Sequence, residues 1–143
     1  MEDRFKNWAK PEIEDGKPTK YNWIVKGKSN FKLGKYTDIG AFSYINASAG
    51  VEIEDNVQIG SGVKIYSINT IDETSGKIIL RKSSKIGTNS VILPNVEIGE
   101  NSIVGALSLI KSGTKISANE IWVGQPAKKI GEIKDGKRVY IKT

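Results

Sequence analysis

Residues 80–116 read LRKSSKIGTNSVILPNVEIGENSIVGALSLIKSGTKI, and every sixth position of this stretch is aliphatic. The seven positions are Leu80, Ile86, Ile92, Ile98, Val104, Ile110 and Ile116. An earlier series with the same spacing comprises Leu33, Ile39, Ile45, Val51, Val57 and Val63. Ile, Leu and Val are 35 of the 143 residues, so chance would fill about three of these thirteen positions. The period of six is therefore a signal of a repeating fold.

Compact residues form a second register, four places after each aliphatic residue. Ten of these thirteen positions hold Ser, Thr or Ala: Thr37, Ser43, Ala49, Ser61, Ser67, Ser84, Ser90, Ser102, Ser108 and Thr114. A period of six fits neither an α-helix nor simple alternation. It fits a short strand and a turn on each face of a three-sided coil, with the aliphatic side chain inside and the small one at the corner. The sequence predicts a single-stranded parallel β-helix of thirteen rungs, in which each coil contacts only its neighbours.

The apolar composition supports an all-β protein. The chain has 21 Ile and 9 Val against 5 Leu and 7 Ala. β-branched side chains favour pleated, half-buried surfaces, whereas helical bundles favour Leu and Ala.

The repeat is interrupted once. The step from Val63 to Leu80 is seventeen residues, which is not a multiple of six. We expect residues 68–79 to leave the coil as a loop, and this loop carries the neighbouring carboxylates Asp72 and Glu73. Loops on a rigid scaffold are frequent places for binding and catalysis.

Three segments follow from the repeat. Residues 1–28 lack the period and are predicted to cap the tube, residues 29–122 to form the β-helix, and residues 123–143 to form a C-terminal motif and tail. Within the tail, Asp135-Gly136 between two apolar runs predicts a β-hairpin, and a short helix is expected near Lys128.

Composition excludes several kinds of chemistry. The chain contains no cysteine and no histidine, which excludes disulfides, thiolate metal sites, Ser-His-Asp triads and histidine-ligated zinc. The net charge is +6, but the lysines are scattered and do not alternate with exposed aromatics, so we expect no nucleic-acid role. No apolar run is long enough to span a bilayer, and the polar N-terminal residues do not resemble a signal peptide. We therefore expect a cytoplasmic protein with no bound metal.

The hexapeptide pattern is followed by Val123-Gly124-Gln125-Pro126-Ala127-Lys128, and together they resemble the left-handed β-helix acyltransferases of the hexapeptide-repeat family. The resemblance covers about residues 29–130. It implies a left-handed coil, a homotrimer with an active site between each pair of subunits, and acetyl-CoA as acyl donor. The stretch around Asn46 and the loop with Asp72 look like enzymes that acetylate sugars or nucleotide-linked amino sugars for polysaccharide or glycan synthesis.

The resemblance also implies positions that hold the acyl donor. Backbone amides of the later rungs are expected along the pantetheine arm, and basic residues after the Pro-Ala-Lys motif are expected at the CoA phosphates. The matching positions in this sequence are Gly87, Gly105, Ala106, Ser108, Gly124, Pro126, Lys128 and Lys129. A polyanionic ligand favours such amide and ammonium donors.

The missing histidine is a departure from the family's O-acetyltransferases, which use one to deprotonate a hydroxyl. It also excludes the carbonic anhydrases of the same fold, which need three histidines for their metal. An amine needs no strong base, because an amine with a pKa near 8 already has a useful neutral fraction and is itself the nucleophile. The sequence therefore favours N-acylation, with a backbone N–H near Ala106 or Gly87 polarising the thioester. We expect Asp72 or Glu73 to hold the ammonium or accept its proton.

Sugar contacts are expected from Asn46, Tyr66 and Asn69. Two other interpretations stay open at this point. One is an O-acetyltransferase that uses Asp72 or Glu73 as its base. The other is a β-helix without catalytic activity that serves in assembly or binding.

Overall fold

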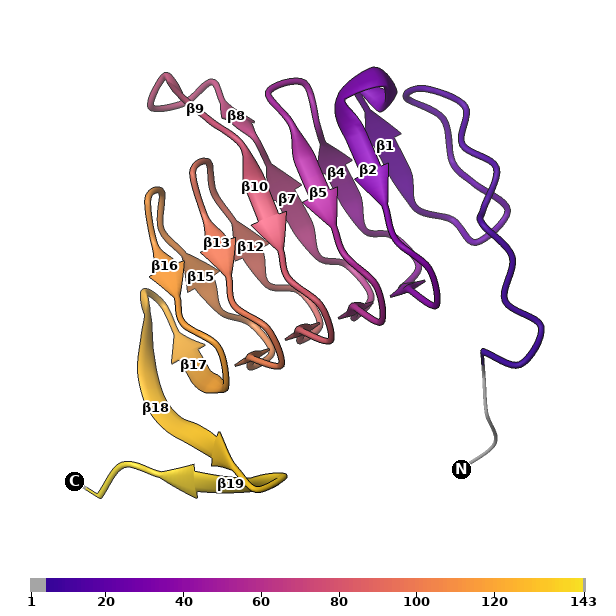
Figure 1. Ribbon diagram of the computed structural model, residues 1–143. Coiled ribbons are helices and arrows are strands. Elements are labelled where there is room, and N and C mark those ends of the chain that lie inside the picture. Colours follow the sequence, from indigo (N-terminus) through magenta and orange to yellow (C-terminus); the bar gives the residue numbers. More distant parts are fainter. Residues whose placement is uncertain (1–4, 143) are drawn as a thin grey trace.

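A computed structural model describes residues 5–142, and it forms one parallel β-helix of five three-sided coils (Figure 1). Three sheets make its walls. Sheet A contains β1 (Ile24–Lys26), β4 (Tyr44–Asn46), β7 (Lys64–Tyr66), β12 (Val91–Ile92) and β15 (Leu109–Ile110). Sheet B contains β2 (Phe31–Leu33), β5 (Val51–Ile53), β10 (Ile78–Leu80), β13 (Glu97–Ile98) and β16 (Lys115–Ile116). Sheet C contains β3 (Asp38–Ile39), β6 (Gln58–Ile59), β11 (Lys85–Ile86), β14 (Ile103–Val104) and β17 (Glu120–Gly124).

The all-β prediction is confirmed, because one 3-10 turn at Lys28–Asn30 is the single helical element of residues 5–142. That stretch contains no helix with the length and apolarity needed to cross a bilayer. The thirteen predicted rungs correspond to β2–β7 and β10–β16. The structure adds β1 at the start and β17 at the end, where Val25 and Trp122 fall outside the two aliphatic series.

The thirteen aliphatic side chains fill the tube, but they occupy two kinds of inward position. Twelve of them are at most 8% exposed, and the thirteenth, Leu33, is partly buried and packs against the cluster. Ile53, rather than Val51, pairs with Leu33 and Leu80. Val51, Val57 and Val63 therefore lie in a second inward column, whose later members are compact residues such as Ser84 and Ser90. The prediction of one aliphatic column per face was incomplete for this reason.

The spacing changes at one corner only. We call the turns from sheet A to sheet B corner AB (residues 27–30, 47–50, 67–77, 93–96 and 111–114). Between equivalent inward positions this corner takes eight residues from Ile45 to Ile53, fifteen from Ile65 to Leu80 and six from Ile92 to Ile98. The other two corners keep six residues in every coil up to Ile116. All variation in coil length is thus confined to corner AB.

The turns from sheet C to sheet A form corner CA (residues 40–43, 60–63, 87–90 and 105–108). Successive coils approach closely here, because a Cβ on Gly87 would lie 2.4 Å from the backbone nitrogen of Ala106. Buried serines tie the coils together: the Ser90 hydroxyl donates to the Gly105 carbonyl at 3.0 Å and accepts from the Ser108 N–H at 3.2 Å. Corner CA is therefore fixed by backbone contact and by a buried hydroxyl.

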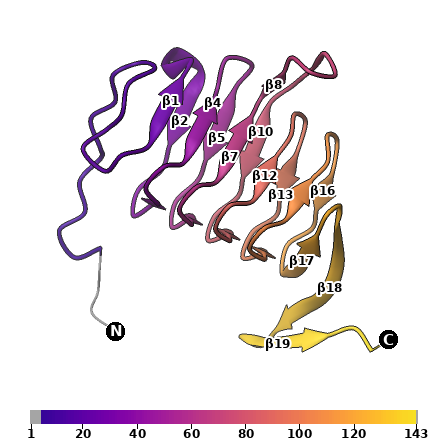
Figure 2. The same cartoon turned by 180° about the vertical axis from the view of Figure 1, so that it is seen from behind.

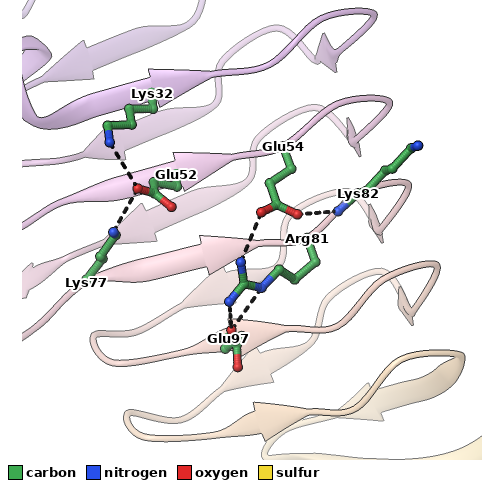
Figure 3. Close-up of polar contacts among 7 residues, drawn as sticks. All are labelled: Lys32, Glu52, Glu54, Lys77, Arg81, Lys82 and Glu97. Atoms are coloured by element: carbon green, nitrogen blue, oxygen red, sulfur yellow. Dashed lines mark hydrogen bonds and ion pairs between the residues drawn. The ribbon is translucent and has the colours of Figure 1, made fainter.

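Charged side chains dominate the outer surface of sheet B (Figure 3). Glu52 Oε1 lies 2.8 Å from Lys77 Nζ and 3.4 Å from Lys32 Nζ. Arg81 bridges Glu54, at 3.0 Å, and Glu97. These six residues, with Lys82, whose N–H donates to Glu54, form an ion-pair ladder that joins coils one to four. Lys77 holds the pKa of Glu52 below its ordinary value, and Lys32 adds to this effect.

At each end of the tube, a segment of the chain pairs antiparallel with one strand of the coils (Figures 1 and 2). At the start, Trp23 is 1% exposed and Pro18 bridges Ile24. At the other end, β18 (Ala127–Lys134) folds back on β17, and β19 (Lys137–Tyr140) folds back on β18. The hairpin predicted at Asp135-Gly136 is confirmed, since Lys134 pairs with Lys137 and both turn residues have positive φ. The helix expected near Lys128 was wrong, because antiparallel pairing with β17 holds that segment as a strand.

Candidate functional site

The fifteen-residue step at corner AB contains a small hairpin. β8 (Ile68–Asn69) pairs antiparallel with β9 (Thr74–Ser75). Residues 70–73 form its tip, where Ile71 is 91% exposed and is followed by Asp72 and Glu73. The Asn69 side chain shapes the tip, because its Oδ1 accepts a hydrogen bond from the Ile71 N–H at 3.2 Å. The predicted loop is thus an ordered projection rather than a slack insertion.

Asp72 is held by its neighbour Thr74. Asp72 Oδ1 accepts from the Thr74 hydroxyl at 2.7 Å and from the Thr74 N–H at 3.1 Å. The hydroxyl contact, followed by backbone contacts, lowers the pKa of Asp72. Asp72 is therefore an anion at neutral pH and a weaker base than an ordinary carboxylate, which suits it to hold a cation.

The predicted sugar contacts lie beside this hairpin. Asn46 and Tyr66 are opposite each other at the ends of β4 and β7, and the Tyr66 ring lies 5.8 Å from that of Tyr44. Asn46 Oδ1 accepts from the Ser48 N–H at 3.0 Å. The structure thus brings five predicted acceptor residues to one edge of sheet A: Asn46, Tyr66, Asn69, Asp72 and Glu73.

The predicted acyl-donor residues lie at the opposite edge of sheet A. Gly87, Gly105 and Ala106 belong to corner CA, and Gly124 and Pro126 follow in the last turn. The Gly87 N–H already donates to the Val104 carbonyl at 2.8 Å, whereas the Ala106 N–H has no acceptor among residues 5–142. Ala106 is thus the better placed of the two predicted oxyanion donors. The Gln125–Pro126 peptide bond is cis.

Ser108 belongs to the same corner but points into the tube. It is 2% exposed, and its hydroxyl donates to the Gly105 carbonyl at 2.7 Å and accepts from the Gly124 N–H at 3.2 Å. These bonds fix the positions of Gly105 and Gly124, so any influence of Ser108 on a bound acyl donor passes through its neighbours.

The two predicted phosphate-binding lysines differ in their surroundings. Lys129 Nζ lies 2.6 Å from Glu132 Oε1 and 3.0 Å from Glu120 Oε2. These two carboxylates raise the pKa of Lys129 and already form ion pairs with its ammonium. Lys128 is exposed, and within residues 5–142 no carboxylate lies at ion-pair distance from it. Lys128 is therefore the more available of the two for an anionic ligand.

One chain does not bring the two groups together. The strands of sheet A separate the acceptor residues at corner AB from the acyl-donor residues at corner CA (Figure 1). Thr74, which orients Asp72, was missed by the sequence reasoning. The spacing Asp72-Glu73-Thr74 is the signal that could have revealed it, because Asp side chains commonly bond to the backbone two residues ahead.

Comparison with known proteins agrees with this fold. The family model "Bacterial transferase hexapeptide (six repeats)" matches residues 77–112. The dTDP-4-amino-4,6-dideoxy-D-glucose acyltransferase of Escherichia coli is 31% identical over 122 residues, covering 74% of this chain and 62% of that protein. A variant of the N-acyltransferase AntD from Bacillus cereus, solved with dTDP and coenzyme A, is 32% identical with a TM-score of 0.70, covering 78% of this chain and 68% of that one.

A hexapeptide-repeat acetyltransferase from Vibrio cholerae, VCA0836, shares the fold at 24% identity with a TM-score of 0.72, covering 79% of this chain and 68% of that one. The expected left-handed β-helix is confirmed, and the chain belongs to the hexapeptide-repeat acyltransferase family. It spans 37–62% of the length of the first three curated relatives that it matches.

Proposed function

We propose that this protein is an acyl-CoA-dependent N-acyltransferase whose acceptor is a nucleotide-linked amino sugar. The observation that carries the proposal is the ordered hairpin that presents the anionic Asp72 in a chain without histidine. A carboxylate suits an ammonium acceptor, and a hydroxyl acceptor would need a stronger base. The similarity to AntD and to the E. coli amino-sugar acyltransferase supports the same acceptor class.

The reaction needs little from the protein beyond positioning. Acetyl-CoA supplies the acyl group as a thioester. Asp72 attracts the acceptor as an ammonium, and after loss of one proton the neutral amine attacks the thioester carbonyl. The C–N bond forms as the C–S bond breaks, and the second proton lost by the nitrogen ends on the departing CoA sulfur. The Ala106 N–H is the proposed donor to the carbonyl oxygen as charge develops there. Glu73 is the neighbouring carboxylate to which the released proton passes, and Asn46, Tyr66 and Asn69 hold sugar hydroxyls.

The corner CA residues suit an extended acyl-CoA. Glycine at positions 87 and 105 lets the next coil lie close, which keeps corner CA compact along several coils, and Lys128 offers an ammonium for the phosphates. We propose that Gly124, Pro126 and Lys129 line the same path, with Ser108 supporting it from inside the tube.

The separation of the two groups supports a site shared between subunits. We propose a homotrimer in which corner CA of one chain faces corner AB of the next. The outer column of sheet A contains Tyr44, Val91 and Leu109 with one charged member, Lys64, whereas sheet B carries the ion-pair ladder, so sheet A is the more apolar of the two faces and supports this arrangement. We further propose that the enzyme acts in the cytoplasm, on a precursor of a surface polysaccharide or glycan.

The test is release of free CoA from acetyl-CoA in the presence of dTDP- or UDP-linked amino sugars. Each amino sugar is paired with the nucleotide sugar that carries a hydroxyl at the same carbon. N-acylation predicts release with the amino sugar alone, with Asp72→Asn losing most of it and Asp135→Asn, in the distant hairpin turn, retaining it. Release with the hydroxyl sugar would instead support O-acetylation. No release with any acceptor, together with no stabilisation by CoA, would support a binding module.

A further inference from the structure

The hairpin is fastened to the next coil by Asn95, in the turn after β12. Asn95 Nδ2 donates to the Ser75 carbonyl at 2.9 Å, and the Asn95 N–H donates to the Gly76 carbonyl at 3.4 Å. A Cβ on Gly76 would lie 1.8 Å from Asn95 Oδ1, so only glycine lets the hairpin base lie this close to the Asn95 side chain. These contacts fix the direction in which the hairpin leaves the tube.

Thr74 lies between the tip and the last coil. Its hydroxyl donates to Asp72 Oδ1 at 2.7 Å and lies 3.5 Å from Ser112 Oγ. A hydroxyl has one proton, and Thr74 gives it to Asp72, so Ser112 is the donor in the second, longer contact. A chain of hydroxyls thus runs from Ser112 on the scaffold through Thr74 to the carboxylate.

The use of Asn95 differs from that of equivalent asparagines. Asn95 and Asn101 have φ values of 63° and 60°, a conformation that asparagine adopts readily. The side chain of Asn101 donates to Asn119 Oδ1 at 2.8 Å, along its own corner of the tube. The side chain of Asn95 also reaches the neighbouring coil at its own corner, but its acceptor is the Ser75 carbonyl at the base of the hairpin and not another asparagine side chain. The same residue type in the same turn conformation therefore serves the scaffold in one place and the hairpin in the other.

We propose that Thr74 and Asn95 are positioning residues of the acceptor site. Thr74 orients the Asp72 carboxylate toward the substrate ammonium. Asn95 holds the hairpin against the next coil, which fixes the position of Asp72 relative to the edge of sheet A. The proposal rests on the proposed function, because it takes Asp72 as the group that meets the amine. It adds two residues that do not touch the substrate themselves.

The test uses Thr74→Val, which keeps the shape and removes the hydroxyl, with Thr74→Ser as the conservative rescue. Thr74→Val is expected to raise KM for the amino sugar about tenfold, as loss of a hydrogen bond to a charged group would, with KM for acetyl-CoA and the melting temperature unchanged. Thr74→Ser is expected to lie within twofold of wild type. Amino-sugar KM values for Thr74→Val within twofold of wild type would overturn the role of Thr74.

Asn95→Gly removes the side-chain amide without straining the turn, and Asn101→Gly is its matched control. Hydrogen exchange without any ligand is expected to accelerate at the Gly76 N–H, which donates to the Ser67 carbonyl at 2.9 Å, in Asn95→Gly and not in Asn101→Gly. Equal exchange in the two variants would overturn the role of Asn95. A wild-type protein that fails to acylate any amino sugar would refute the proposed function, a different outcome from an active wild type with an unaffected Thr74→Val.

Discussion

Corner AB and corner CA lie at the two edges of the same sheet, yet they follow opposite rules. Corner AB takes eight, fifteen or six residues, whereas corner CA takes six residues in each of its turns. The reason lies in the packing of the turns. At corner CA this close approach of a glycine to the backbone of the next coil recurs at Gly40, Gly60 and Gly87. At corner AB it occurs at Gly27, and the longest turn projects outward as a hairpin. An extra residue at corner CA would shift every inward column after it.

The two edges of sheet A therefore offer different kinds of binding surface. Corner CA offers a regular backbone surface for a ligand that extends along several coils. Corner AB offers a side-chain projection that can differ between coils without disturbing the core. Changes at corner AB are therefore expected to alter activity with little effect on stability, and changes at corner CA to alter stability first.

The largest expected effect is on activity, from removing the hairpin. Deleting residues 68–74 shortens the step from Ile65 to Leu80 to eight residues, as between Ile45 and Ile53. Because Asp72 and Glu73 are lost while the columns stay aligned, acyl transfer to an amino sugar should fall by about 100-fold or more. The melting temperature, followed by circular dichroism, should change by only a few degrees, since loop length contributes little to stability. Failure of this variant to fold would contradict the proposed tolerance of corner AB.

Next is a change at corner CA. Gly87→Ala places a Cβ 2.4 Å from the Ala106 nitrogen, so the coils must separate, and unfolding free energy should fall by about 2–3 kcal/mol. The matched control is Gly105→Ala, where the nearest atoms belong to the Val123 side chain at 3.2 and 3.3 Å and can move aside. Urea denaturation should separate the two variants clearly. Equal losses would show that close backbone approach does not set the spacing at this corner.

A smaller loss of unfolding free energy is expected from replacing Arg81, next to the longest turn. Arg81 follows the long step and joins Glu54 of the coil before to Glu97 of the coil after. Arg81→Met leaves two carboxylates facing each other and should cost about 1 kcal/mol in low salt, less at high ionic strength. Adding Glu54→Gln and Glu97→Gln should recover most of the loss in urea denaturation. A loss that is independent of salt would point to packing rather than charge.

The smallest effect concerns pH. Lys77 and Lys32 lower the pKa of Glu52 in the folded protein, so its stabilising contribution is present above the ordinary value of 4.5 and is lost as the pH falls through the lowered pKa. Unfolding free energy measured in urea should decline in this acidic range. Glu52→Gln should remove part of that decline, less than about 1 kcal/mol because the side chain is partly exposed. An identical acid profile for the variant would exclude Glu52 as a contributor.

The sequence predicted the coil because its period is a direct consequence of the geometry. Every rung needs an aliphatic side chain inside, and the spacing of six survives wherever the turns are short. The first series changes column part-way, although its spacing of six continues. Val51, Val57 and Val63 occupy the second inward position of their rungs and not the one that Leu33, Ile39 and Ile45 occupy. Two inward positions per strand both accept valine, so hydrophobicity alone could not separate them.

The candidate site was predicted less fully. Asp72 and Glu73 stood out as carboxylates in the one interruption, and the structure places them on an ordered tip beside Asn69. Asn95 and Ser112 could not be associated with them from sequence, because they are twenty or more residues away and meet the hairpin only after the coils stack. The engagement of Lys129 with Glu120 and Glu132 depends equally on the reversal of β18, where a helix had been expected.

That reversal has a consequence for the molecule as a whole. A stack of parallel strands exposes unpaired N–H and C=O groups at each end, and identical stacks can join through them into growing fibres. Here β18 crosses the edge of β17 in the antiparallel sense, and residues before β1 do the same through Pro18 and Ile24. A second copy therefore meets a strand of the wrong polarity at these two edges. Antiparallel pairing thus blocks the addition of a further parallel strand at the end of sheet C and at the start of sheet A, which works against polymerisation of a repetitive protein with itself.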